Sequence, residues 1–195
     1  MLKVIWGKRP MPHHLALSLA VLCGLMVAAC AAVPTADLAT VPSVDLTRYA
    51  GTWYEVARLP MFFQRHCAAS KATYRLRPDG AVDVHNECVT TSGHQATADA
   101  VATVADPATR AKLRVVFDNF FARLAGASEE GNYWILHLDE KYRTAVVGTP
   151  DRRYLWILAR QPRLDDETYQ QLVTFARSRG YATDELIRDQ WPATP

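Results

Sequence analysis

The sequence predicts an all-β fold with one flanking α-helix, in which eight antiparallel strands form an up-and-down β-barrel. Between about residues 45 and 160, short segments of β-forming residues alternate with turn residues at close spacing. Only residues 165–180, which follow these segments, show a clear helical pattern. A parallel sheet needs a crossover after each strand, so a single helix argues against one. Closing the eight strands into a barrel removes the exposed edges of the meander.

Eight segments are expected to form the strands. The first contains the stretch TWYEVAR, which combines β-forming residues with turn formers on either side, Gly51 and Pro60. The clearest hairpin lies within residues 70–89 and supplies the second and third strands. The remaining strands are expected within residues 96–105, 111–120, 132–139, 143–150 and 154–162.

The turn of this hairpin sets its register. A two-residue Asp-Gly loop would place a carboxylate on the apolar face. A three-residue Pro78-Asp79-Gly80 loop instead pairs Leu76 with Val82 and Tyr74 with Val84, which keeps one face apolar. The glycine supplies the positive φ that this type of turn requires. We therefore expect the three-residue loop.

The helix is expected over residues 165–180. Asp165 and Asp166 place negative charge where a helix N-terminus favours it, and Gly180 provides a C-terminal stop. Apolar residues at three- and four-residue spacing form one face that can pack on the sheet, namely Tyr169, Leu172, Val173 and Ala176.

Residues 1–29 are expected to be a lipoprotein signal peptide. A basic start precedes an apolar run of about fifteen residues, which is short for a membrane-spanning helix. The run ends in Val27-Ala28-Ala29-Cys30, which resembles the lipobox of bacterial lipoproteins. In those proteins the cysteine becomes the lipidated N-terminus, so Cys30 is the expected lipidation site. A plain signal peptide cut nearby and an uncleaved anchor are the alternatives.

The residues after the lipobox divide into a tether and a domain. Ala31 follows the cysteine, where an aspartate would resemble an inner-membrane retention signal. This favours the outer membrane, on its periplasmic face. Residues 30–44 are expected to be the lipidated cysteine and a flexible tether, because small residues and prolines dominate there. Residues 45–192 then form a single domain.

Charge and cysteine usage narrow the classes of function. A formal net charge of +2 is too small to indicate a nucleic-acid surface. Cys67 and Cys88 remain in an exported chain, where a disulfide can persist, although two separate buried thiols are the alternative. No histidine pair at ligand spacing accompanies them, so neither a metal site nor a cofactor is expected.

Three stretches in order resemble the lipocalins, most closely the bacterial outer-membrane lipocalins that carry a lipid anchor. They are Gly51-Thr52-Trp53-Tyr54-Glu55, the segment LDEKYRTAVV and the segment RRYLWILARQP. The resemblance implies that Trp53 closes the narrow end of the barrel, that Arg160 lies across its ring, and that Gly51 belongs to the same structural closure. A guanidinium over an indole gains cation–π attraction. Glu55, as a lone carboxylate on a strand, is not expected to be catalytic.

Alternate residues of a strand share one face, and the resemblance to lipocalins implies which face points into the barrel. Together they predict the residues that line a ligand cavity. They are Tyr74, Val84, Val115, Phe117, Tyr133, Ile135, His137, Val147, Tyr154 and Trp156. Two aromatic pairs are expected at the mouth, as a lid, a membrane-dipping edge, a dimer surface or simple loop packing. These pairs are Phe62 with Phe63 and Phe120 with Phe121. An interior filled by side chains stays open as an alternative.

The resemblance implies a non-catalytic lipocalin that binds, stores or transports fatty acids or lysophospholipids for envelope maintenance under stress. The expected partners are the lipid and the outer membrane, with a homodimer possible and no nucleic acid. A lipocalin-fold enzyme is a rival, but no Gly-x-Ser-x-Gly motif occurs, and Ser70 and Ser92 lack a recognisable base. A filled barrel that binds a protein at its rim is the third hypothesis.

Overall fold

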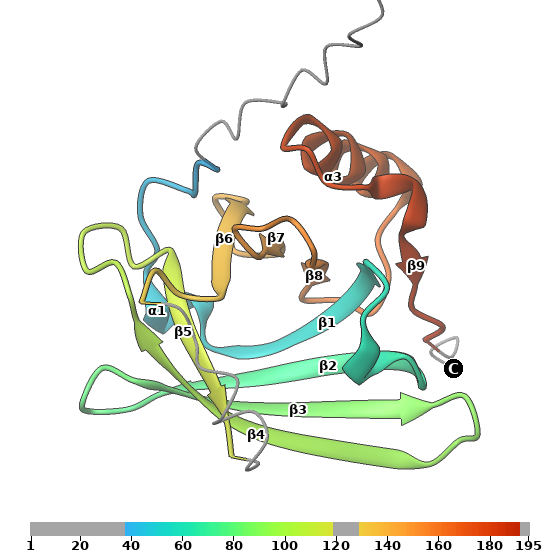
Figure 1. The fold of residues 1–195 in the computed structure, drawn as a ribbon, viewed down its shortest axis with the longest axis horizontal. Helices are drawn as coiled ribbons and strands as arrows, with labels where there is room; N and C mark the ends of the chain where they lie inside the picture. The colour runs from blue at the N-terminus through green and yellow to red at the C-terminus, as the bar shows by residue number, and fades with distance from the viewer. Residues whose placement is uncertain (1–37, 119–128, 192–195) are drawn as a thin grey trace, which may run out of the picture. The chain divides into compact units, whose positions relative to one another are not determined.

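The computed structural model describes residues 38–118 and 129–191. Residues 37–195 form one compact unit. Its strands make a single antiparallel sheet in the order β2-β3-β4-β5-β6-β7-β8-β1-β9, and a further pairing between β1 and β2 closes the barrel (Figure 1). The predicted eight-stranded barrel with one flanking helix is therefore confirmed. The predicted signal peptide of residues 1–29, Cys30, Phe120 and Phe121 lie outside the described residues.

The elements follow the predicted segments closely, with four short additions: α1, η1, η2 and β9. The strands are β1 (Gly51–Arg58), β2 (Cys67–Leu76), β3 (Val82–Thr90), β4 (Gln95–Val104), β5 (Lys112–Phe117), β6 (Tyr133–Leu138), β7 (Thr144–Gly148), β8 (Leu155–Ala159) and β9 (Ile187–Arg188). The helices are α1 (Leu46–Tyr49), η1 (Phe62–Gln64), α3 (Asp166–Ser178) and η2 (Thr183–Glu185). No helix within the described residues is long and apolar enough to cross a membrane.

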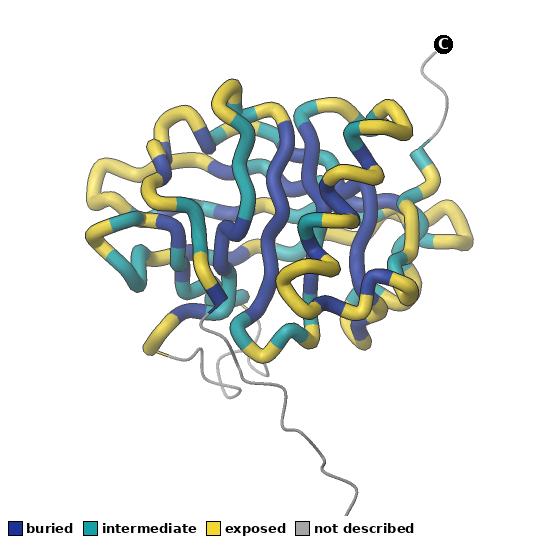
Figure 2. The backbone as a smooth tube through the Cα atoms, turned by 90° about the horizontal axis from the view of Figure 1, so that it is seen from above, coloured by how far each residue is buried: buried dark blue, intermediate teal, exposed yellow. Residues whose placement is uncertain are grey.

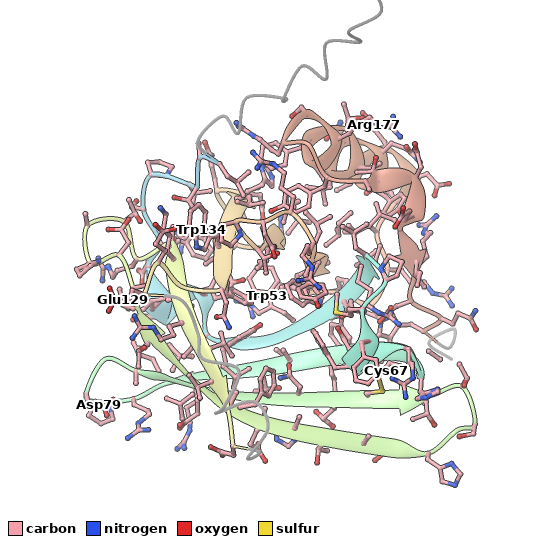
Figure 3. The ribbon with its side chains drawn as sticks, in the orientation of Figure 1. Trp53, Cys67, Asp79, Glu129, Trp134 and Arg177 are labelled. Carbon is pink, nitrogen blue, oxygen red and sulfur yellow. A yellow bond between two sulfur atoms is a disulfide. The ribbon has the colours of Figure 1, made fainter. Side chains whose placement is uncertain are left out.

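The β2–β3 hairpin has the register of the three-residue loop. Leu76 pairs with Val82 and Tyr74 with Val84. Gly80 adopts a φ of 85°, in the left-handed region that the turn requires. Continued along the strands, this register places Ser70 opposite Cys88. Cys67 is the first residue of β2, and its disulfide to Cys88 ties β2 to β3 (Figure 3).

Strand β1 changes partners along its length. Its first half pairs with β2, from Gly51 to Tyr54. A bulge lies between Glu55 and Ala57 in its pairing with β8, and β9 pairs with Ala57 beyond it. The chain after β9 continues across to β2, where the backbone N–H of Gln190 donates to the carbonyl of Ala68 at 2.8 Å. The C-terminal segment therefore fills the gap that opens between β1 and β2.

Two apolar clusters form the core. One occupies the barrel interior, and the other lies between α3 and the outer faces of β1, β6, β7 and β8. The predicted helix face is confirmed, because its four apolar residues are buried in the second cluster. The Asp165 side chain caps α3 by accepting from the backbone N–H of Thr168 at 2.8 Å. Figure 2 shows that buried residues lie in the middle of the molecule and that most exposed residues lie in the turns at its periphery.

Candidate ligand-binding site

The barrel interior contains most of the residues predicted to line a cavity. Eight of the ten belong to the interior cluster, namely Tyr74, Val84, Val115, Phe117, Tyr133, Ile135, Val147 and Trp156. They come from strands β2, β3, β5, β6, β7 and β8. Alternation along each strand turns every second side chain inward, so these residues meet although they are far apart in sequence.

His137 does not line the interior, and its predicted place was wrong. A bulge between Ile135 and His137 interrupts the pairing of β6 with β7. The extra residue switches the face that His137 presents. Its ring contacts Phe175 of α3, with the ring centroids 5.1 Å apart. Partial burial there lowers the pKa of His137 below its usual range.

Tyr154 lies at the rim of the barrel and does not belong to the interior cluster. It precedes the start of β8 at Leu155. Its ring packs edge-on against Phe63 at 5.5 Å and contacts Trp156 at 6.4 Å. Phe62 and Phe63 are 77% and 58% exposed, so this aromatic group borders the open end of the barrel. Tyr154 therefore lies on the same side as Trp156, as predicted from strand alternation, but at the rim and just before the start of β8.

Trp53 and Arg160 lie together at the opposite, closed end of the barrel. Trp53 is fully buried, and the Arg160 guanidinium carbon lies 4.0 Å from the centroid of its ring (Figure 3). Arg160 also donates to the carbonyls of Thr52 and Ala50, both at 2.9 Å. Gly51 has a φ of 92°, and a Cβ at this position would lie 3.3 Å from the Arg160 guanidinium. This arrangement holds the start of β1 against the end of β8.

Three tyrosine hydroxyls meet inside the barrel. The Tyr133 hydroxyl is hydrogen-bonded to that of Tyr49 at 2.8 Å and to that of Tyr74 at 3.0 Å. Burial raises the pKa of Tyr74 to about 12 and raises the pKa values of the other two above their usual range. All three are therefore neutral at physiological pH. Tyr49 was not nominated from the sequence because it lies on α1, before the first strand.

A small cavity adjoins two of these tyrosines. Its volume is about 60 Å³, and it is lined by Glu55, Ser70, Lys71, Ala72, Tyr74, Tyr133, Trp156 and Leu158. This is room for a small chemical group, whereas sites for whole drug-sized ligands have volumes of roughly 300–1,000 Å³. Entry of a long acyl chain therefore requires interior side chains to move apart.

A buried ionic cluster lies beside the cavity. The Arg58 Nη1 donates to the Glu55 carboxylate at 2.9 Å and to the Asp189 carboxylate at 2.8 Å. The other Asp189 oxygen accepts from the backbone N–H of Ser70 at 2.7 Å. Burial, followed by repulsion from Glu55, raises the pKa of Asp189 to about 9, and burial also raises the pKa of Glu55. The two carboxyl groups therefore hold a proton between them at neutral pH.

Gln64 connects this cluster to the interior. Its side-chain nitrogen donates to Glu55 at 3.0 Å and to the Ser70 hydroxyl at 3.2 Å. Its side-chain oxygen accepts from the Trp156 indole at 3.0 Å. The sequence did not indicate Gln64, Arg58 or Asp189 as site residues, because they meet only through the fold. Only Arg58 gave a signal in the sequence, as a charged residue at the end of an apolar strand.

The described residues offer little for nucleophilic catalysis. Ser70 is hydrogen-bonded to Gln64. Ser92, expected to lack a base, in fact lies 2.9 Å from the Nδ1 of His94, but both are exposed on the β3–β4 turn and neither lines the cavity. Within the described ranges no group of three His, Cys, Asp or Glu residues is placed to hold a metal ion. The arrangement therefore suits binding of an apolar ligand with a small polar group.

Comparisons with curated proteins identify close relatives. The chain is 37% identical over 161 residues to temperature-induced lipocalin-1 of Arabidopsis thaliana, covering 82% of this chain and 86% of that protein. It is 36% identical over 171 residues to the outer membrane lipoprotein Blc of Escherichia coli (strain K12), covering 87% and 92%. It is also 29% identical over 153 residues to bovine apolipoprotein D, covering 75% and 77%.

Solved structures share the fold at lower sequence identity. Insecticyanin from the tobacco hornworm Manduca sexta matches with a TM-score of 0.60 at 19% identity, covering 80% of this chain and 86% of that one. Lobster apocrustacyanin A1 matches with a TM-score of 0.56 at 13% identity, covering 75% and 79%. The family model of the lipocalin-like domain matches residues 44–190, a range that contains every strand of the barrel and α3. The chain therefore belongs to the lipocalin family.

Proposed function

We propose that this protein is a non-catalytic lipid carrier that holds one single-chain lipid, a fatty acid or a lysophospholipid, inside its barrel. The observation that carries the proposal is the apolar barrel interior with a small cavity at one side, which aromatic rings and the Glu55 side chain border. Relatives named as lipocalins and as outer membrane lipoproteins support it.

The binding free energy of a lipid in such a carrier would come mainly from burying its chain among the interior side chains. Each buried methylene group contributes about 0.8 kcal/mol. Val84, Val115 and Val147 are among the small residues that surround the interior, and Phe117 and Trp156 are only partly buried. A chain would therefore enter by displacing these partly buried larger side chains.

We further propose that residues 1–29 are removed, that Cys30 is lipidated, and that the protein is tethered to the periplasmic face of the outer membrane. There it would store or move lipids for envelope maintenance under stress. The lipobox-like Val27-Ala28-Ala29-Cys30 and the named outer membrane lipoprotein relatives support this location. Labelling of the expressed protein with radioactive palmitate tests the anchor. The Cys30→Ser variant should lose the label, and retained label would contradict the assignment.

The carrier function is tested with a soluble form that begins at residue 31, which retains the whole compact unit of residues 37–195. Native mass spectrometry of this form, purified without detergent, should show one bound lipid per barrel. The same spectrum reports whether the protein is a dimer. The second candidate is a barrel filled by its own side chains, because the cavity volume is small. A protein that carries no ligand and also takes up no fatty acid or lysophospholipid after delipidation would favour this candidate.

A further inference from the structure

We propose that the cavity beside Glu55 binds a positively charged nitrogen, an ammonium or quaternary ammonium group, in the head of a single-chain lipid. This inference rests on the proposed carrier function and names the chemical class of its ligand. It is carried by three features of the cavity: its aromatic walls, its buried carboxylate and its size.

The walls of the cavity present aromatic rings. Tyr74, Tyr133 and Trp156 border it from β2, β6 and β8. Tyr74 and Tyr133 pack edge-on with their centroids 6.2 Å apart, so their rings point in different directions around the cavity. Aromatic faces attract cations, tryptophan most strongly, and the attraction grows when the cation is desolvated. Several rings around one cavity are typical of sites for quaternary ammonium groups.

The ionic cluster beside the cavity contains more negative than positive groups. Glu55 and Asp189 both contact one guanidinium nitrogen of Arg58, at 2.9 and 2.8 Å. The other terminal nitrogen of Arg58 donates to the carbonyls of Gln64 and Cys67. Two ionised carboxylates would therefore leave one negative charge uncompensated in a buried place, which is costly. In the free protein the proton held between the two carboxyl groups balances this charge, and a cationic nitrogen beside Glu55 would take the place of that proton.

The cavity gives an anionic head no comparable partner among the described residues. Lys71 borders the cavity, but its ammonium group pairs with Glu87 at 3.0 Å. Arg58, the nearest buried cation, has both terminal nitrogens occupied by protein oxygens. Its Nε has no hydrogen-bond partner, but Arg58 does not line the cavity. A carboxylate head would instead face Glu55. The charges therefore favour a cationic nitrogen over a carboxylate.

The size of the cavity fits a head group and not a chain. About 60 Å³ accommodates a group with few heavy atoms. Tyr74 pairs across the hairpin with Val84, and both belong to the interior cluster that includes Val115 and Phe117. A chain attached to the bound head would therefore lie among these apolar side chains.

The test compares four probes that share a twelve-carbon tail and differ in their heads. The delipidated form that begins at residue 31 is titrated by calorimetry, below the micelle concentration, with dodecyltrimethylammonium, dodecylphosphocholine, dodecanoate and dodecyl maltoside. The first two carry a cationic nitrogen, and we expect them to bind at least about ten-fold more tightly than the other two, which corresponds to about 1.4 kcal/mol.

Substitutions at the cavity test whether its residues cause the preference for cationic heads. Glu55→Gln should weaken binding of dodecyltrimethylammonium about ten-fold and leave binding of dodecyl maltoside unchanged. Glu167→Gln is the matched control, because the same substitution on α3 removes an exposed carboxylate that does not border the cavity. Tyr74→Phe keeps the ring and should keep the preference, whereas Tyr74→Leu should reduce it.

The outcomes separate this inference from the proposed function. Equal affinity for all four heads, or tighter binding of dodecanoate, overturns the inference and leaves the lipid carrier intact. Binding of none of the probes, together with no uptake of natural lipids, overturns the carrier function itself. Should Glu55→Gln fail to fold, the head-group series on the wild-type protein still decides the question.

Discussion

The guanidinium of Arg58 lies 2.8 Å from the carboxylate of Asp189, a residue 131 positions later in the chain. This contact joins the end of β1 to the segment after β9. The same carboxylate accepts from the backbone N–H of Ser70 on β2. One buried side chain therefore holds together three segments at the place where β1 and β2 separate.

This contact predicts a specific dependence of stability on pH. The folded protein raises the pKa of Asp189 to about 9, whereas an unfolded aspartate has a pKa of about 3.9. Between these values the folded state binds more protons, so the contribution of Asp189 to the free energy of unfolding falls as pH rises. The slope is at most about 1.4 kcal/mol per pH unit.

The Asp189→Asn variant isolates this effect, because its amide does not titrate. Relative to the wild type, its free energy of unfolding in urea should rise between about pH 5.5 and about pH 9. The amide keeps one of the two oxygens that accept from Arg58 and Ser70, and the loss of the other imposes a cost that does not change with pH. Asp184→Asn is the control, since that carboxylate is exposed and paired with Arg177. Parallel pH profiles for the wild type and Asp189→Asn would contradict the assignment.

Arg160→Lys is expected to destabilise the closed end of the barrel. Lysine lacks the planar fork that lets Arg160 cover Trp53 while it donates to several carbonyls. We expect a loss of about 1–3 kcal/mol in the free energy of unfolding, measured with urea. Arg75→Lys, which alters an exposed pair with Asp83 on the hairpin, should change it by less than about 0.5 kcal/mol. Equal effects of the two substitutions would refute a special role for Arg160.

Tyr133→Phe is expected to cost more stability than Tyr49→Phe. The Tyr133 hydroxyl is the shared partner of two buried hydroxyls, whereas that of Tyr49 contacts Tyr133 alone among the tyrosines. Removing the shared partner leaves two buried polar groups unpaired, at about 1–3 kcal/mol each. Thermal unfolding of both variants checks the order, and the reverse order would show that the three hydroxyls do not act as described.

The disulfide is expected to stabilise the barrel by about 3 kcal/mol, because Cys67 and Cys88 close a loop with a sequence separation of 21. The double variant Cys67→Ser/Cys88→Ser should unfold at a correspondingly lower urea concentration. Adding reductant should lower the wild-type midpoint to the same value and leave that of the variant unchanged. The prediction fails if reductant does not change the wild-type unfolding midpoint and two thiols react before denaturation. That result would show that the disulfide is absent in solution.

Local pattern was sufficient to predict the barrel, the hairpin register and the buried face of α3. Each depends on residues close in sequence: the Pro-Asp-Gly loop fixes the pairing of Leu76 with Val82, and three- and four-residue spacing fixes the helix face. The bulges were not predictable in this way. The one before His137 moves a single side chain to the outer face, and alternation alone carries no sign of it.

The ionic cluster was beyond sequence reasoning for a different reason. Asp189 follows α3 in a segment with no strand pattern, and β9 is only two residues long. Its position beside Arg58 depends on how α3 packs on the barrel. The sequence therefore indicated the apolar part of the candidate site, whereas its polar part became visible only in the fold.

The most direct test of the carrier function is a titration of the delipidated form that begins at residue 31 with lysophospholipids of increasing chain length. The account predicts saturation at one lipid per barrel. It also predicts affinity that rises by up to about 0.8 kcal/mol per added methylene until the interior is full. The Trp156→Ala variant should weaken this binding. Absence of saturable binding at every chain length would contradict the account and would leave a barrel filled by its own side chains.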